Sequence, residues 1–303
     1  MKTWSTPVTA DSQENKKIPC TLCNGSVFLP ALTCEGFSFV RCKNCGLVQM
    51  NPQPKKEEII RRYTTMFGKD YLEYELKNEA AFLNLQLLAL KDIGFLAQAQ
   101  ESGGAFLDIG CATGALPAFL KECGWLTTGV EISPGAEYAQ KKRNLDVRQQ
   151  PLEEINFPSR SFDVVHASHL IEHLNDPRSF LTEVRRVLKD GGQIYITTPN
   201  IAGFQARLFG GKWRSAIYDH LYLFSKRTLT KLLKETGFKV DRIRTWGGLA
   251  AGIAPQWLKK SADVFAKFLN CGDVMIIRGT CRPEQSYQSG PKGASGSHSR
   301  LCQ

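Results

Sequence analysis

Four residues between positions 108 and 131 have the types and the spacing of a nucleoside-binding site. An apolar run ends in Asp108, and a turn that contains Gly110 and Gly114 follows it. A helical pattern and a second apolar run then lead to Glu131. Glycines at such a turn let the backbone approach a ligand closely, and an acid that closes the second strand can accept both hydroxyls of a ribose. Strand, glycine loop, helix, strand and acid is the order of a mononucleotide-binding βαβ unit.

The spacing of the two glycines excludes two common phosphate-binding loops. A Gly-x-Gly-x-x-Gly loop places a pyrophosphate on the helix N-terminus, whereas three residues separate Gly110 from Gly114. The Lys-Ser/Thr pair of a P-loop does not follow the turn either. The sequence therefore predicts a nucleoside ligand that brings no phosphates to this loop.

This stretch resembles the first motif of class I S-adenosylmethionine-dependent methyltransferases. The resemblance implies that Asp108 helps to hold the methionine part of the cofactor and that Glu131 takes the ribose hydroxyls. It also implies that Gly110 and Gly114 shape the loop. The common family loop has glycine where this chain has Ala112, and we expect one added methyl group to change little.

Adenine recognition departs from the pattern of related enzymes, which often carry an acid where this chain reads Gln149-Gln150-Pro151-Leu152. We expect adenine to be read by backbone groups near Leu152 or by the Gln150 side chain. The full set of residues expected to bind the cofactor is Asp108, Gly110, Cys111, Gly114, Glu131, Ile132, Gln150, Leu152 and His169.

Candidate catalytic side chains follow the expected fourth and fifth strands. His169, Glu172 and His173 come after the fourth strand, and His220 comes after the fifth. Open α/β sheets bind ligands beyond the carboxyl ends of their strands. Histidine, with an ordinary pKa of about 6.5, can take a proton from an acceptor hydroxyl near neutral pH. We expect Glu172, His173 and His220 to be catalytic and His169 to line the cofactor pocket, with capping or packing as the alternative for each histidine. His166 lies within the strand and is expected to be structural.

The segment SFDVVHASHLIEHLNDPRSFLTEVRRVLKDGGQIYITTPN strengthens the resemblance. It is similar to the branch that includes ubiquinone-pathway O-methyltransferases and many small-molecule and sugar methyltransferases. The later run HLYLFSKRTLTKLLKETGF is similar to the same branch. The resemblance spans residues 18–280 and implies methyl transfer from S-adenosylmethionine to oxygen or carbon of a small molecule, a sugar or a lipid-linked metabolite.

Four cysteines near the N-terminus have the spacing of a structural metal site. Cys20-x-x-Cys23 and Cys42-x-x-Cys45 are separated by eighteen residues, and each pair can form a tight knuckle that aims two thiolates at one point. The sequence predicts a closed, tetrahedral Zn²⁺ site without zinc chemistry. Metal binding can stabilise a module too short to bury enough surface by itself. An N-terminal zinc ribbon joined to such a domain is similar to bacterial methyltransferases of cell-surface sugar and secondary-metabolite pathways.

Apolar runs that alternate with helical patterns organise the rest of the chain. They predict an α/β fold, namely a Rossmann-like, doubly wound, mostly parallel sheet preceded by a small zinc ribbon. In the family that the chain resembles, the last strand of this sheet is antiparallel. Leucines at helical spacing predict one helix over 55–98 that covers the cofactor. The expected domains are the zinc ribbon at 18–50, a helical linker or cap at 51–100, the methyltransferase domain at 101–282 and a disordered tail at 283–303.

The net charge of +10 is unevenly distributed, because residues 201–245 contain ten Lys/Arg and three Asp/Glu. A basic region can attract nucleic acid, an anionic membrane or a phosphorylated substrate. Residues 201–224 also mix aromatic side chains with glycines. They fit a substrate lid, a capping subdomain, or a segment on an anionic membrane surface with Phe204, Phe209, Trp213 and Phe224 inserted.

Three functions are therefore compared. The first hypothesis is a methyltransferase that acts on a small molecule, a sugar or a lipid-linked metabolite. The second is an rRNA or tRNA methyltransferase that binds RNA with the zinc ribbon and the basic segment. The third is an inactive scaffold that binds S-adenosylmethionine. No apolar run reaches the length of a membrane-spanning helix, and the N-terminus lacks the apolar region of a secretory signal. We expect a cytoplasmic protein, with peripheral attachment to the inner face of the membrane as the variant.

Overall fold

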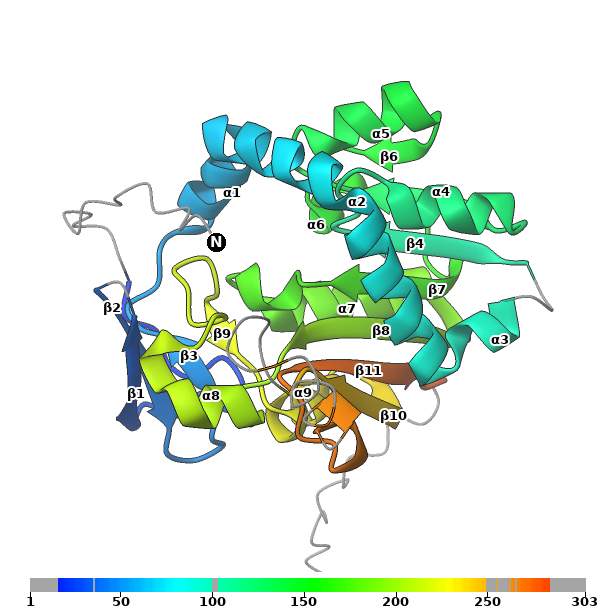
Figure 1. The fold of residues 1–303 in the computed structure, drawn as a ribbon. Coiled ribbons are helices and arrows are strands. Elements are labelled where there is room, and N and C mark those ends of the chain that lie inside the picture. Colours follow the sequence, from blue (N-terminus) through cyan, green and yellow to red (C-terminus); the bar gives the residue numbers. More distant parts are fainter. Residues whose placement is uncertain are drawn as a thin grey trace, which may run out of the picture.

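A seven-stranded sheet forms the body of the protein. The computed structural model describes residues 16–34, 36–99, 103–248, 255, 261, 263–264 and 266–283. Within them the strand order is β10-β11-β8-β7-β4-β5-β6 (Figure 1). The parallel strands are β4 (Ala105–Ile109), β5 (Leu126–Val130), β6 (Asp146–Arg148), β7 (Phe162–Ser168) and β8 (Leu188–Pro199). β11 (Val274–Cys281) runs antiparallel between β8 and β10 (Phe238–Trp246). The predicted mostly parallel sheet with an antiparallel last strand is confirmed.

Helices connect the strands as a doubly wound sheet requires. They are α4 (Ala115–Glu122), α5 (Gly135–Arg143), α6 (Leu152–Ile155), α7 (Pro177–Val187) and α9 (Lys226–Glu235). α7 begins because the Asp176 side chain accepts hydrogen bonds from the backbone N–H groups of Arg178 and Ser179, with Pro177 in the first turn. A parallel crossover of this kind brings the carboxyl ends of the strands to one edge, where a ligand can bind.

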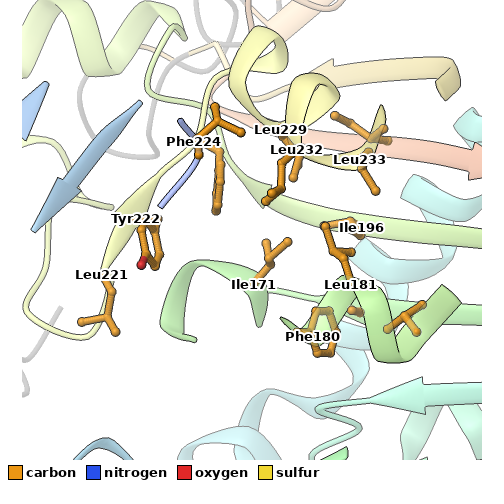
Figure 2. Close-up of a cluster of buried hydrophobic side chains, with 14 of the residues drawn as sticks. Ile171, Phe180, Leu181, Ile196, Leu221, Tyr222, Phe224, Leu229, Leu232 and Leu233 are labelled. Carbon is orange, nitrogen blue, oxygen red and sulfur yellow. The ribbon is translucent and has the colours of Figure 1, made fainter. Parts of the chain in front are cut away.

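The two faces of the sheet carry separate apolar clusters. Along β8, Ile194 and Ile196 belong to one cluster and Tyr195 to the other, because successive side chains of a strand point to opposite faces. On the first face, Ile196 lies among Phe180 and Leu181 of α7 and the leucines of α9 (Figure 2). On the second face, apolar residues of α2 and α4 bury Phe106, Tyr195 and Ile276.

The region predicted as one helix over 55–98 consists of three helices. They are α1 (Lys56–Thr64), α2 (Met66–Ile93) and α3 (Phe95–Ala99). Thr65, in an extended conformation, separates the first two, and Gly94, at φ 90°, ends the second. α2 contacts α4, β10 and β11 and crosses the molecule in front of the sheet (Figure 1). The Arg143–Glu79 ion pair and a hydrogen bond from Arg242 to the Ile93 carbonyl hold it there.

The cysteine-rich segment folds as a small antiparallel sheet in the order β1-β2-β3-β9. Its strands are β1 (Phe28–Cys34), β2 (Phe37–Cys42), β3 (Val48–Met50) and β9 (Tyr222–Leu223). β9 comes from the segment between β8 and α9, which also holds α8 (Phe204–Phe209) and the short 3-10 helix η2 (Gly210–Lys212). The module predicted at 18–50 therefore shares its sheet with a strand from far along the chain.

The predicted disordered tail and the expected absence of a membrane-spanning helix are considered next. The tail predicted to be disordered lies, from residue 284 onward, outside the described residues. Among the helices in the described part of the chain, none is long and apolar enough to cross a membrane.

Candidate active site

The glycine loop follows β4 and adopts a backbone conformation that glycine favours. Gly110 and Gly114 have φ values of 74° and 75°, in the left-handed region. The N–H groups of Gly110 and Cys111 both donate to the Val130 carbonyl, so the loop is fixed to the end of β5. Ala112 also has a positive φ, 51°. An L-residue costs roughly 1–2 kcal/mol in this region, and the expectation that alanine changes little here stays a prediction.

Glu131 closes β5 and clamps the loop. Its two carboxylate oxygens accept hydrogen bonds from the backbone N–H groups of Ala112, at 2.9 Å, and Ser133, at 2.8 Å. The side chain is half-buried and lines the cavity described below. These bonds hold the carboxylate in one orientation, and the remaining lone pairs fit the hydroxyls of a ribose. The residues at this corner therefore suit the nucleoside part of S-adenosylmethionine.

Four other residues expected to bind the cofactor are not on the wall of this cavity. Asp108 is buried, and its Oδ1 lies 2.7 Å from Nδ1 of the buried His166. Among the described residues that line the cavity, neither Asp108, Cys111 nor Gly114 occurs. Asp108 precedes the loop on β4, and Cys111 and Gly114 belong to the loop itself. Gln150 is exposed and also lies off the cavity wall, so the expectation that its side chain reads adenine is not supported.

One large cavity joins the nucleoside corner to the candidate catalytic residues. Its volume is about 2260 Å³, whereas a pocket for one drug-sized ligand measures roughly 300–1,000 Å³. Expected site residues on its wall are Gly110, Glu131, Ile132, Leu152, His169, His173 and His220. The space is sufficient for a nucleoside cofactor and an acceptor together.

Sequence reasoning missed the aromatic wall that α1 and α2 contribute to this cavity. Tyr63, Phe67 and Tyr71 follow one another along the two helices, with ring centroids 5.7 and 6.1 Å apart. Arg62 lies over the Phe67 ring at 4.2 Å and forms an ion pair with Asp219. The spacing of Phe67, Tyr71 and Tyr74 at i, i+4 and i+7 was a usable signal of one aromatic helix face.

Glu75, an acid on the same wall of the cavity, has a raised pKa. Burial, together with the nearby Glu131 carboxylate, raises the pKa of Glu75 to about 8. Glu75 is therefore largely protonated at neutral pH. Positive charge brought into the cavity beside it would favour its ionised form.

The structure brings the three predicted catalytic residues together. Glu172 and His173 lie on η1 (Ile171–His173), which follows β7. His220 approaches from the segment before β9, so that its ring centroid lies 4.7 Å from that of His173. A backbone hydrogen bond from the Leu221 N–H to the Glu172 carbonyl links this segment to η1. Glu172 and His220 are buried, whereas the His169 side chain is about half exposed on the wall.

Hydrogen bonds define the tautomers of the two clustered histidines. Nδ1 of His173 lies 2.8 Å from the Asp219 carbonyl, and Nδ1 of His220 lies 2.8 Å from the Ser215 carbonyl. A carbonyl only accepts, so these two contacts assign Nδ1 as the donor in each ring; the Tyr63 hydroxyl also lies 3.0 Å from Nδ1 of His173. Burial and the neighbouring His173 lower the pKa of His220 to about 3. Burial raises the pKa of Glu172, but His169 and the other histidines outweigh it and hold that pKa at about 2.

The cysteine cluster has the geometry of a tetrahedral metal site. The Sγ atoms of Cys20, Cys23, Cys42 and Cys45 all lie within 4.8 Å of one another. Sulfur atoms around Zn²⁺, at about 2.3 Å from the ion, are about 3.8 Å apart, and the pairs Cys20–Cys45 and Cys23–Cys42 are 3.4 and 3.5 Å apart. The sulfur donors therefore fit Zn²⁺ in number and spacing. Cys34 is not among them, and its Sγ donates to the Ala216 carbonyl.

The segment 201–224 is packed into the protein by two of its aromatic residues. Trp213 is buried and donates from Nε1 to the buried Asp273, and Phe224 is buried in the core. The expectation that both insert into a membrane is therefore wrong. Only Phe204 among the four predicted insertion residues is an exposed large hydrophobic side chain.

The parallel sheet, the phosphate-free glycine loop and the clamped acid define a class I S-adenosylmethionine-dependent methyltransferase. A family profile described as a methyltransferase domain matches residues 81–243, more than half of the chain. The chain belongs to this family. Membership in this family supports S-adenosylmethionine as the cofactor of this domain.

The chain is also similar to individual known methyltransferases. A ubiquinone biosynthesis O-methyltransferase of Klebsiella pneumoniae is 32% identical over 139 residues, which are 41% of this chain and 55% of that protein. One from Coxiella burnetii is 28% identical over 113 residues, 35% of this chain and 48% of that protein. The chain thus spans about half the length of these curated relatives. A methyltransferase structure from Thermotoga maritima has a TM-score of 0.54 at 24% identity, with 74% of this chain and 98% of that chain covered. It shows the shared fold.

Proposed function

We infer that this methyltransferase acts on a hydroxyl or carbon acceptor of a small molecule, a sugar or a lipid-linked metabolite. One observation carries the proposal. A single cavity is lined by Glu131 at one place and by His173 and His220 at another, and Glu172 lies buried against these two histidines. An acceptor bound between them lies beside the donor and beside groups that can take a proton. The similarity to ubiquinone biosynthesis O-methyltransferases supports a small acceptor.

The residues of the chain supply position and proton transfer. When bound, S-adenosylmethionine supplies a methyl group activated on a sulfonium. We expect Glu131 to orient the ribose, and the aromatic residues of α1 and α2 line the same cavity. Holding the reacting groups in line contributes several kcal/mol, about 7–11 in the best intramolecular models. The free Nε2 of His173 can accept the proton of an acceptor hydroxyl, and ionised Glu172 stabilises the resulting charge.

The cavity wall favours a small acceptor over a polynucleotide. The wall includes the aromatic side chains of Tyr63, Phe67 and Tyr71. Apart from Arg214, the cations of residues 201–245 lie on four elements, namely α8, η2, α9 and β10. Several of them are engaged, as Arg214 is with Asp273 and Lys231 with Glu235. A grip on a phosphate backbone needs clustered cations.

Radiolabelled S-adenosylmethionine tests the proposal directly. The purified protein is offered phenols, sugar nucleotides and lipid-linked sugars in parallel with total RNA, and label in each product is counted. We expect transfer to a member of the first three classes and loss of at least tenfold in turnover for His173→Ala. Transfer to RNA alone would overturn the small-acceptor proposal. Full turnover in both His173→Ala and His220→Ala would remove proton transfer by these histidines.

A further inference from the structure

Glu172, His173 and His220 form a second group of potential metal ligands, apart from the four cysteines. One carboxylate oxygen and one ring nitrogen from each histidine lie within 4.8 Å of one another. Their elements come from positions far apart in the sequence, η1 and the segment that precedes β9. Two imidazoles and one carboxylate converging from two segments is the donor set of many divalent transition-metal sites.

The histidines have the orientation that metal ligands require. Each ring is fixed by a hydrogen bond from Nδ1 to a backbone carbonyl, Asp219 for His173 and Ser215 for His220. In metal sites, such a bond from the far nitrogen fixes the tautomer and the direction of the ring. It leaves Nε2 of both rings as the nitrogen directed away from the carbonyl.

Glu172 offers a buried oxygen that lacks a hydrogen bond. Oε2 accepts from the Thr198 hydroxyl at 2.9 Å. Oε1 has no hydrogen-bond partner in the described structure, although the side chain is 1% exposed. Nδ1 of His169 lies 3.3 Å from it. A buried, unpartnered carboxylate oxygen is costly, and an ion between Glu172 and the two histidines would satisfy it.

We propose that Glu172, His173 and His220 bind a divalent transition metal at the acceptor end of the cavity. The position at the acceptor end rests on the proposed function, in which the acceptor binds in the cavity that His173 and His220 line. Two imidazole nitrogens and one carboxylate favour Zn²⁺, Fe²⁺, Mn²⁺ or Co²⁺ over Mg²⁺ or Ca²⁺, which prefer oxygen ligands. Three protein ligands leave coordination positions open toward the cavity, as in catalytic rather than structural sites.

The ion would change how an acceptor hydroxyl is activated. A bound dication lowers the pKa of a hydroxyl that becomes its next ligand. The hydroxyl proton then passes to water in the cavity. The oxygen–carbon bond forms as the carbon–sulfur bond of S-adenosylmethionine breaks, and the bonding electron pair stays on sulfur to give S-adenosylhomocysteine. In this arrangement the two histidines hold the ion and the proton goes to solvent.

Metal content and Co²⁺ spectroscopy test the site without an activity assay. The full chain is stripped, reconstituted with Co²⁺ and analysed by mass spectrometry and electronic absorption. We expect two equivalents, one with thiolate charge-transfer bands and one with weak d–d bands only. His220→Ala and Glu172→Gln should each retain the thiolate signal and fall to one equivalent. Glu73→Gln, which changes an exposed acid of α2 outside the trio, should keep two.

The outcomes separate this proposal from the proposed function. S-adenosylmethionine binding by calorimetry shows that each variant is folded. A wild-type protein that takes up one equivalent only, all of it thiolate-bound, in excess Co²⁺ overturns the second site. If that protein still methylates a small acceptor in the presence of a chelator, the proposed function stands without the metal. If two equivalents bind but no small acceptor is methylated, the metal site stands and the acceptor class is wrong.

Discussion

The hydroxyl of Tyr222 lies 2.8 Å from the hydroxyl of Thr21. This contact joins the cysteine-rich segment to β9, the strand that follows His220. The same Tyr222 hydroxyl donates to the Asn175 carbonyl, just beyond η1. Met50 of β3 donates its N–H to the carbonyl of Leu221. The module is thus attached beside the candidate active site, and its order and the position of His220 are expected to depend on each other.

Tyr222→Phe tests this attachment. The change keeps the ring and removes the hydroxyl, so we expect a loss of about 1–2 kcal/mol in the free energy of unfolding, because polar partners are left unsatisfied. Urea denaturation measures it. The same change in a Thr21→Ala background should cost less, since one of the bonds is already absent. Equal costs in the two backgrounds would contradict coupling through this contact.

Removal of one cysteine ligand tests the zinc site. Cys20→Ser should release one metal equivalent and lower the melting temperature, because a structural zinc ion contributes folding free energy to its module. It should also speed amide exchange in β9, which pairs with β3. Cys123→Ser, at an exposed position away from the cluster, is the matched control. Retention of all metal by Cys20→Ser would count against the site.

Glu131→Gln tests the nucleoside corner. The amide group cannot accept from both the Ala112 and Ser133 N–H groups, so the loop loses a clamp and the ribose loses an acceptor. Hydrogen bonds to a charged group are worth about 1.5–3 kcal/mol, and we expect affinity for S-adenosylmethionine to fall roughly 10- to 100-fold. Calorimetry gives the dissociation constant. Glu137→Gln on exposed α5 should bind like wild type; an unchanged constant in Glu131→Gln would exclude the assigned role.

The raised pKa of Glu75 predicts how stability depends on pH. An acid with a pKa of about 8 in the folded state, against an ordinary value of 4.5, stabilises the fold fully below pH 4.5. This contribution is lost as the pH rises from about 4.5 to about 8. Glu75→Gln should therefore match wild type at pH 5 and exceed its unfolding free energy at pH 9.

Denaturation curves at pH 5, 7 and 9 measure this difference. Glu73→Gln, at an exposed position on the same helix, should leave the pH slope of the wild type in place. Parallel pH profiles for wild type and Glu75→Gln would show that Glu75 is not the group responsible.

Local patterns in the sequence were sufficient for the fold class, the glycine loop and the two cysteine pairs. Each depends on residues close together in the chain, such as Gly110, Gly114 and Glu131, whose spacing matches one supersecondary unit. Alternating apolar runs likewise specify a parallel sheet, because crossover connections are nearly always right-handed and short. The sequence also placed Glu172, His173 and His220 at the carboxyl edge of that sheet.

Only the tertiary structure decided which of these residues meet. It brought His220 to within 4.7 Å of His173 between ring centroids, turned Asp108 away from the cavity toward His166, and added β9 to the cysteine module. It also broke the helix predicted over 55–98 at Thr65 and Gly94, so that α1 and α2 wall the cavity. Such contacts depend on strand order and on the burial of surfaces far apart in the chain, which periodicity within one segment does not encode.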